Sequence, residues 1–214
     1  MPGKTGNITK GVNMIEGDTP TGEIIFFNEE DHKYFTDKGM MLDSVTQILE
    51  AEGYIDTRWF KEEYAFRGTM VHKAIEAINR KAATFSDFRN AFFYPYIEAY
   101  MWFVIDTGFK PDWIEKFVCN IDKGIAGCLD ITGTIRGKNV LIDVKTGSPL
   151  DWHPIQLAAY ARMGEITDYQ RYDLHLRKNA RYTLKDSHKR LGNYNDPKWI
   201  RSWKQTENHW NSAA

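Results

Sequence analysis

The chain has 214 residues, of which 42% are hydrophobic and 14% aromatic, and a formal net charge of −1. These values exclude a disordered chain, and no apolar run approaches the roughly 20 residues that cross a bilayer. The N-terminal segment contains neither the apolar core of a signal peptide nor the arginines of a transit peptide. We therefore expect a soluble, cytoplasmic protein that has no membrane partner.

The two cysteines, Cys119 and Cys128, are too few for a disulfide framework or for a four-cysteine metal site. They lie nine residues apart across a predicted hairpin. We interpret them as reduced thiols in the core, and a disulfide between them is the alternative.

The charge is distributed unevenly. Residues 29–63 contain ten acids and four bases, a net of −6, whereas residues 171–190 contain seven bases and two acids, a net of +5. A protein that handles a polyanion needs local positive surface rather than a basic total. The simpler interpretation is that both segments are ordinary solvated faces.

The N-terminal half predicts an arm, a hairpin and helices. Residues 1–22 are rich in Gly, Thr, Asn and Pro and predict a flexible arm. Residues 23–37 read as a β-hairpin with an acidic turn. Asp43 or Ser44 can cap a helix that ends at Gly53.

Two longer helices follow. The apolar spacing predicts one helix over about 57–80, which Gly68 can break. Ser86 can cap another over 86–108, where Pro95 marks either a kink or a boundary between two helices.

After residue 108 the pattern becomes β-rich. Three runs separated by short DKG and RGKN turns predict a three-strand antiparallel meander. Asp151 can cap a helix with Pro154 in its first turn and Gly164 at its end. Two more strands surround residues 178–180, and 196–211 predicts a final helix.

The order of elements predicts an α/β fold with a mixed central sheet, a three-strand meander, flanking helices and an N-terminal helical layer. We expect one domain over residues 23–214. Its parts are a hairpin and helical part (23–107), a catalytic core (108–190) and a C-terminal helix (191–214).

Charged residues interrupt two of the predicted strands. Asp130 lies in GCLDIT, and Asp143 and Lys145 lie in VLIDVKT, two residues apart and therefore on one strand face. Burying such charges is costly unless a cation compensates them. A shared Mg²⁺ would compensate both carboxylates, although a salt bridge on the strand face is the alternative.

The residues around these charges match a known family. GCLD at 127–130, DVKTG at 143–147 and QLAAY at 156–160 resemble the motifs of the RecB-like branch of the PD-(D/E)XK nucleases. RGTMVHKAIE at 67–76 and SVTQIL at 44–49 resemble its upstream segments. Mitochondrial genome maintenance exonucleases and many phage-encoded exonucleases share this arrangement, which implies a restriction-endonuclease-like core.

The resemblance implies roles for individual residues. Asp130, Asp143, the Val144 carbonyl and His72 would be ligands of Mg²⁺ or Mn²⁺, and Lys145 would be the catalytic lysine. Gln156 and Tyr160 would contact substrate or ligands. Some relatives hold an iron–sulfur cluster, and because this chain lacks the cysteines for it, we expect none here.

Further residues are candidates around the predicted site. His72 and Glu76 are four residues apart on a helix, so Glu76 is either a second-layer residue that orients His72 or a surface acid. Glu115 lies on the first strand of the meander and can point into the site. We expect phosphate contacts from five basic residues: Arg162, Arg171, Arg177, Lys178 and Arg181. Aromatic residues among 64–102 can stack unpaired bases, although we expect most of them to lie in the core.

The resemblance implies a metal-dependent DNA exonuclease that prefers single-stranded ends and acts in replication, recombination or repair, with proteins of those pathways as partners. A structure-specific or restriction-type endonuclease and a non-catalytic DNA-binding module are the alternatives. We expect a monomer.

Overall fold

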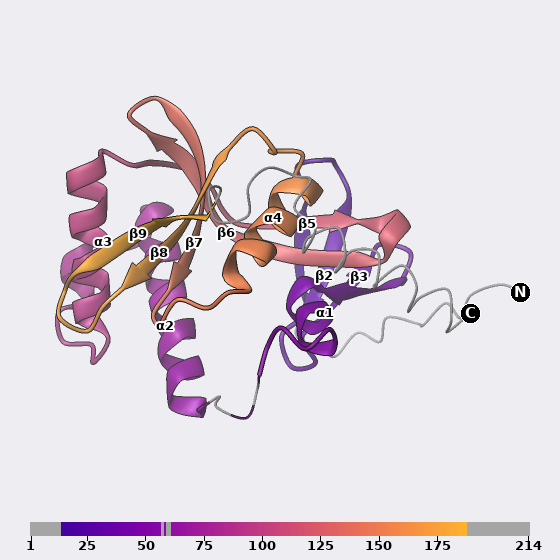
Figure 1. Cartoon of the computed structure of the whole chain (residues 1–214), viewed down its shortest axis with the longest axis horizontal. Helices are drawn as coiled ribbons and strands as arrows, with labels where there is room; N and C mark the ends of the chain where they lie inside the picture. Colours follow the sequence, from indigo (N-terminus) through magenta and orange to yellow (C-terminus); the bar gives the residue numbers. More distant parts are fainter. Residues whose placement is uncertain (1–13, 57, 59–60, 188–214) are drawn as a thin grey trace, which may run out of the picture.

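The computed structural model describes residues 14–56, 58 and 61–187 (Figure 1). These residues form an α/β protein with a mixed nine-strand sheet and four α-helices. The strands are β1 Met14–Asp18, β2 Ile24–Asn28, β3 Lys33–Thr36, β4 Met41–Ser44, β5 Lys110–Asn120, β6 Ile125–Ile135, β7 Lys138–Lys145, β8 Gln170–Leu176 and β9 Tyr182–Asp186. The helices are α1 Val45–Ala51, α2 Glu62–Asn79, α3 Tyr94–Thr107 and α4 His153–Met163.

The predicted meander is present. Strands β5, β6 and β7 pair antiparallel in succession, and β8 and β9 form the second predicted strand pair. Strand β8 lies parallel to β7, and β4 lies parallel to β6, so the sheet is mixed. The strand order is β1-β2-β3-β4-β6-β7-β8-β9, with β5 on the other edge of β6.

Strand β6 changes partner along one edge, and this change creates a gap in the sheet. β4 pairs with it at Ile125 and Ala126, and β7 pairs with it only from Ile131 onward. Between these points, no strand of the described chain pairs with that edge of residues 127–130. We call this unpaired stretch the fork. It lies between the ends of two different strand pairs, which leaves backbone groups available to side chains.

The N-terminal segment is more regular than the sequence suggests. The predicted hairpin is β2–β3, but β1 and β4 extend it to four antiparallel strands. The prediction of a flexible arm over 1–22 is therefore wrong for Met14–Asp18, which pairs with β2 residue by residue. Its backbone hydrogen bonds hold this mostly exposed strand, which lacks a hydrophobic alternation. Residues 1–13 lie outside the described part.

The helix ends agree with some of the predictions and differ from others. Ser44 caps α1 in a capping box with Gln47, as expected, and α2 is continuous through Gly68. Pro95 sits in the first turn of α3, where its missing N–H costs nothing, so the boundary between two helices is the correct alternative. The preceding short 3₁₀ helix, Phe85–Phe88, is capped by Thr84, not Ser86.

One further prediction needs correction, and another concerns residues outside the described part of the chain. The residue that caps α4 is Trp152, without a side-chain hydrogen bond, so the prediction that Asp151 caps it is wrong. Pro154 lies in the first turn of this helix, where its fixed φ suits the helical backbone. The predicted C-terminal helix over 191–214 lies outside the described residues.

Two apolar cores lie on the two sides of the central strands. One contains α1 and α4 against inward-facing residues such as Leu129 and Leu141. The other contains α2 and α3 against residues such as Ile131 and Ile142. A smaller cluster joins β2–β4 to β5 and β6. The described helices include none long and apolar enough to cross a membrane.

Candidate metal centre

Three side chains from three elements converge beside the fork. His72 comes from α2, Glu115 from β5 and Asp130 from β6, and one ligand atom from each lies within 4.8 Å of the other two. His72 Nδ1 is 3.5 Å from Glu115 Oε1 and 3.7 Å from Asp130 Oδ1. We call these three residues the metal group.

The backbone of β5 is irregular next to and at Glu115. The β5–β6 register shifts between Pro111 and Ile114, and Glu115 itself has a φ of +47°. The pairs Ile114–Ile131 and Lys116–Leu129 flank Glu115 and Asp130, which places these two carboxylates opposite each other. Like charges opposite each other destabilise a sheet, and a left-handed non-glycine residue adds strain. A bound cation would offset the repulsion.

Asp130 also replaces a missing strand contact. Its Oδ2 accepts a hydrogen bond from the Val144 N–H at 2.6 Å, just beyond the point where β6 and β7 cease to pair. Burial and the charge of Glu115 raise the pKa of Asp130, against the lowering effect of His72 and Lys145. The carboxyl therefore sits where a cation would stabilise its charged form.

His72 is held from the opposite side by the same residue of β7. Its Nε2 lies 3.0 Å from the Val144 carbonyl, and because a carbonyl can only accept, Nε2 carries the proton. Nδ1 then faces the carboxylates. Burial lowers the pKa of His72, but Asp130 and Glu115 more than reverse this and raise the pKa to about 9. A backbone carbonyl that fixes one ring nitrogen is the usual support for a metal-binding imidazole.

Asp143 and Lys145 form an ion pair next to the metal group. Lys145 Nζ is 2.6 Å from Asp143 Oδ2, and both side chains are largely buried. Burial raises the pKa of Asp143 to about 6, against the lowering effect of Lys145. Burial lowers the pKa of Lys145, but Asp143 and Asp130 outweigh this and raise it. Lys145 is therefore an ammonium at neutral pH.

The predicted α4 residues join this pair. Lys145 Nζ donates to Gln156 Oε1 at 3.1 Å, and Gln156 Nε2 donates to Thr46 Oγ1 at 3.1 Å. The buried amide thus orients the lysine and ties α4 to the first turn of α1. Lys145 Nζ also lies 5.3 Å from the centre of the Trp152 ring. The sequence identifies Gln156, and Thr46 lies in the SVTQIL segment of the resemblance, but no role is predicted for Thr46 or Trp152.

The ring of Tyr160 packs against Gly127, at one end of the fork. The tyrosine is 6% exposed, and a Cβ built on Gly127 would lie only 2.4 Å from its Cε1 atom. The glycine of the GCLD motif is therefore required by the close approach of a ring. Burial, then the surrounding charges, raises the pKa of Tyr160, so its hydroxyl stays neutral.

Gly127→Ala is expected to lower the free energy of unfolding by about 1–3 kcal/mol, because the added methyl group overlaps the Tyr160 ring. Gly68→Ala is the matched control: its Cβ meets only Thr146 Oγ1 at 3.8 Å, and alanine favours the helix by about 1 kcal/mol. Urea denaturation measures both. Equal stability of the two variants would contradict the close approach.

The metal group opens onto a cleft of about 1060 Å³. Its lining includes seven carboxylates and three Lys or Arg side chains. The acids are Glu16, Asp18, Glu29, Glu76, Asp112, Glu115 and Asp130, and the bases are Lys73, Arg80 and Lys116. Glu76 accepts from Arg80 at 2.9 Å, so its carboxylate points along α2 rather than into the metal group. The cleft is acidic, unlike an ordinary anion-binding site.

The predicted phosphate contacts lie elsewhere. Arg177 Nη1 donates to the Gly147 carbonyl at 3.4 Å, which brings the β8–β9 turn next to the end of β7. Lys178 and Arg181 belong to the same turn and its exit, and Arg162 is exposed on α4. None of these four is among the residues that line the cleft. Arg171 is 1% exposed, which leaves it little surface for DNA.

A second group of possible ligands is buried behind Lys145. His153, Asp173 and His175 also have one ligand atom each within 4.8 Å of the others. The His153 and His175 rings are 5.8 Å apart, and His175 Nδ1 lies 3.2 Å from the Gly147 carbonyl. Burial lowers the pKa of His175 to about 4, so it is neutral. The sequence offers no spacing that brings β8 and α4 together here.

The donors of the metal group fit a hard divalent cation. Two carboxylates and one imidazole suit Mn²⁺ or Mg²⁺, which would complete their coordination with water. Relative to the sequence prediction, Glu115 joins His72 and Asp130, whereas Asp143 lies on the adjacent strand and pairs with Lys145. The Val144 backbone lies between them and contacts both Asp130 and His72. No protein-family model matches this sequence, and a search of curated proteins finds no significant relative.

Proposed function

We propose that the protein is a Mg²⁺- or Mn²⁺-dependent DNA nuclease with a restriction-endonuclease-like core of the RecB-like PD-(D/E)XK type. In this proposal it is an exonuclease that prefers single-stranded ends and acts in replication, recombination or repair. One observation carries it: two opposed carboxylates and an imidazole lie beside a buried, charged lysine. The sequence motifs support the same conclusion independently.

In this proposal, the residues have separate roles in phosphodiester hydrolysis. A cation held by His72, Glu115 and Asp130 would act as a Lewis acid on the phosphate and lower the pKa of a bound water. Lys145 is an ammonium, so it stabilises negative charge that develops on the phosphate rather than accepting a proton. Asp143 and Gln156 hold its Nζ in place.

The acidic cleft supports a metal requirement. Among the described residues, seven carboxylates and only three Lys or Arg side chains line the cleft, so a DNA phosphate that enters it meets net negative charge unless a cation lies between them. Simple ionic attraction, the usual source of affinity for DNA, is therefore weak on this side of the molecule. The arrangement suits a protein that binds DNA only after the metal ion is bound.

Binding of Mn²⁺ should release a proton, and its affinity should rise with pH. The pKa of His72 is about 9 without metal, so at pH 7 the imidazole is protonated and must lose a proton to become a ligand. Below pH 9 the affinity should fall roughly tenfold for each pH unit. Calorimetric titration at pH 6.5 and 7.5, in two buffers of different ionisation enthalpy, measures the proton count. An affinity equal at both pH values would contradict a His72 that is protonated at neutral pH and deprotonated by metal binding.

The function is tested with end-labelled linear and circular DNA, each single-stranded and duplex, in Mg²⁺ or in EDTA. Metal-dependent loss of linear single strands alone supports the proposal. Cleavage of circles indicates an endonuclease, and retention without cleavage indicates a DNA-binding module. Size-exclusion chromatography of the same samples tests whether the protein acts as a monomer.

A further inference from the structure

Three exposed aromatic rings lie near the N-terminal end of α2 and just before α3, and two of them are in contact. The side chains of Tyr64, Phe66 and Phe92 are 47%, 58% and 65% exposed. The rings of Phe66 and Phe92 are stacked, with centroids 6.0 Å apart and planes 9° from parallel. Grouped apolar rings in water are unfavourable and mark binding surfaces. We call these three residues the aromatic platform.

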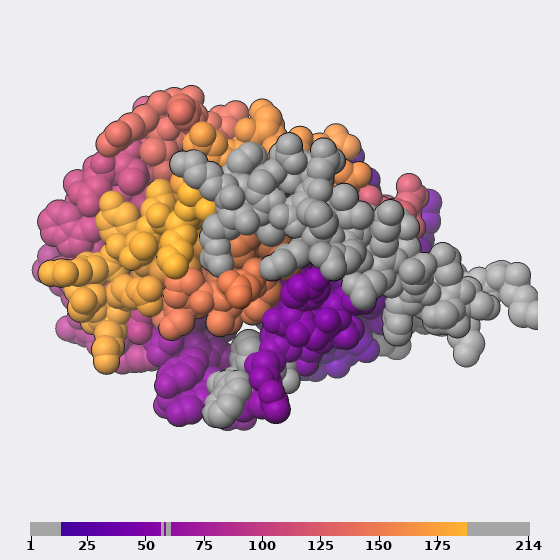
Figure 2. All heavy atoms as spheres, in the orientation of Figure 1, coloured from indigo at the N-terminus to yellow at the C-terminus, as the bar shows by residue number. Residues whose placement is uncertain are grey.

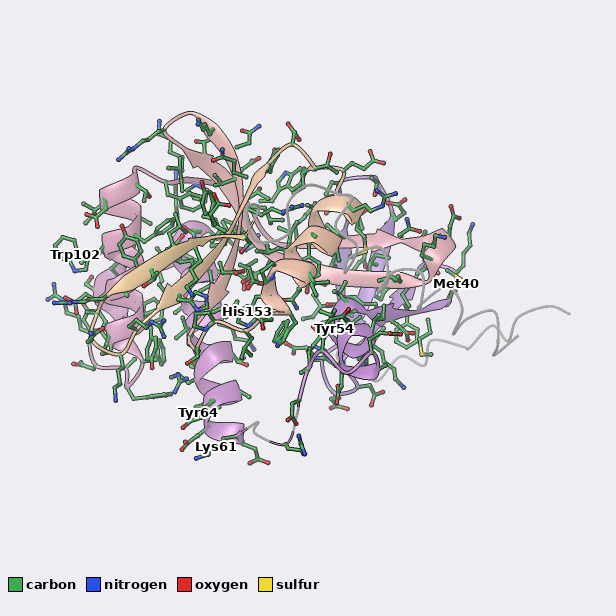
Figure 3. The ribbon with its side chains drawn as sticks, viewed as in Figure 1. Met40, Tyr54, Lys61, Tyr64, Trp102 and His153 are labelled. Carbon is green, nitrogen blue, oxygen red and sulfur yellow. The ribbon has the colours of Figure 1, made fainter. Side chains whose placement is uncertain are left out.

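The platform is rigidly supported. Phe92 contacts Phe93 edge-to-face at 5.3 Å, and Phe93 is 4% exposed in the core. Phe66 and Tyr64 project from a continuous helix. In Figure 3, Tyr64 lies at the free end of α2, next to Lys61, and Figure 2 shows this end on the outer surface. The rings therefore present preformed flat faces to solvent.

Positive charge lies beside the platform. The Arg67 guanidinium is 4.9 Å from the Tyr64 ring centre and 5.2 Å from that of Tyr96. Its Nη2 donates to the Thr146 carbonyl at 3.4 Å, and its buried Nε has no hydrogen-bond partner among the described residues. Lys61 Nζ lies 5.5 Å from the Tyr64 ring centre.

The platform is close to the candidate metal centre. Phe66 and His72 are six residues apart on one helix, which is about 9 Å along its axis. Arg67 contacts the residue that follows Lys145. A strand whose bases rest on the platform can thus extend a phosphate towards the metal group.

We propose that the aromatic platform binds unpaired bases of single-stranded DNA by stacking, next to the cleavage site. This inference rests on the proposed function and names the part of the substrate that the protein holds. Stacking is independent of charge, so it can supply the affinity that the acidic cleft cannot. Bases inside a duplex have covered faces and cannot reach the rings, so the platform selects single strands.

The test is a double-mutant cycle between protein and ligand, measured by fluorescence anisotropy in Mg²⁺. The proteins carry Lys145→Ala to prevent cleavage, with or without Phe66→Ala and Phe92→Ala. The ligands are a labelled 12-nucleotide single strand, the same strand with two abasic sites, and the matching duplex. Trp102→Ala is the control, since Trp102 is 44% exposed on α3 and lies apart from Tyr64 in Figure 3.

Alanine in place of a stacking ring weakens the binding of each stacked base about fivefold or more. The Phe66→Ala/Phe92→Ala protein should therefore bind the intact strand at least tenfold more weakly. It should discriminate little between intact and abasic strands, whereas the parent protein discriminates clearly. Trp102→Ala should bind as the parent does, and circular dichroism should show all variants folded.

Three results would overturn the inference. These are unchanged single-strand affinity in the double variant, an equal loss of affinity for duplex, and a dimer of the parent protein that the double variant abolishes. The last result would identify the platform as a contact between copies of the chain. Because binding is measured without cleavage, the two proposals can fail separately. If linear strands are cleaved but the platform substitutions do not change binding, the nuclease proposal remains and the platform proposal fails. If the platform substitutions weaken single-strand binding but no cleavage occurs, the platform proposal remains and the nuclease proposal fails.

Discussion

Lys145→Ala is expected to reduce phosphodiester cleavage by about 10³-fold, the upper end of what one lost donor to a developing negative charge removes. The lysine is the cation nearest Asp143, at 2.6 Å, and it is held by Gln156. No other Lys or Arg side chain of the described residues forms an ion pair with that carboxylate. Single-turnover cleavage of an end-labelled single strand in Mg²⁺ measures the effect.

The same variant should also be less stable. It leaves Asp143 buried without its cation, and breaking a buried pair in this way costs about 3–5 kcal/mol. A domain with typical stability of about 5–15 kcal/mol still folds, so circular dichroism should show a native spectrum with a lower melting temperature. Lys110→Ala removes an exposed lysine from the start of β5 and is the control. Cleavage within twofold of the parent rate in folded Lys145→Ala protein would contradict the assigned role.

Asp130→Asn should abolish metal binding while leaving the metal-free protein at least as stable as the parent. The amide oxygen can still accept the Val144 N–H, so the strand contact remains. The substitution removes one of two opposed carboxylates, which relieves repulsion from Glu115. Sites that hold strained or repelling groups for function commonly gain stability when those groups are removed.

Melting curves in increasing Mn²⁺ test this expectation. At a concentration of 100 times the dissociation constant, the parent protein should gain about 2.7 kcal/mol of stability, and Asp130→Asn should gain almost none. Asp112→Asn is the control, because Asp112 lines the same cleft but lies outside the metal group. Equal Mn²⁺-dependent shifts in all three proteins would show that the cation binds elsewhere.

The core of the fold was predictable from sequence because its signals are local. Short turns of Gly, Asp, Asn and Lys define the meander, and side-chain alternation along β7 places Asp143 and Lys145 on one face, as their ion pair confirms. The capping box of Ser44 and the position of Pro95 follow from similar local rules. These features depend on residues within a few positions of each other.

The features that sequence could not provide depend on contacts distant along the chain. The sequence indicates Glu115 only as a residue that can point into the site; its left-handed backbone and the nearby irregularity in the β5–β6 register are announced by no residue pattern. Strand β1 is specified by its pairing with β2 rather than by apolar alternation. The resemblance assigns His72 and the Val144 carbonyl to one cation, but it does not predict the direct contact between them, which spans 72 positions.

The acidic lining of the cleft was also not foreseen. The sequence concentrates negative charge in residues 29–63, but the cleft collects carboxylates from three strands (β1, β5 and β6), the β2–β3 turn and helix α2, between residues 16 and 130. The basic residues near the β8–β9 turn lie outside that lining. Charge along the sequence therefore indicated the kind of partner less well than the charge that the fold brings together.

The most direct test of the metal centre is the anomalous scattering of Mn²⁺ in crystals of the protein. A peak is expected about 2.0–2.6 Å from carboxylate oxygens of Asp130 and Glu115, with His72 Nδ1 as a further ligand. The peak should disappear in Asp130→Asn crystals. A peak confined to His153, Asp173 and His175, or none in the metal group at saturating Mn²⁺, would contradict the account.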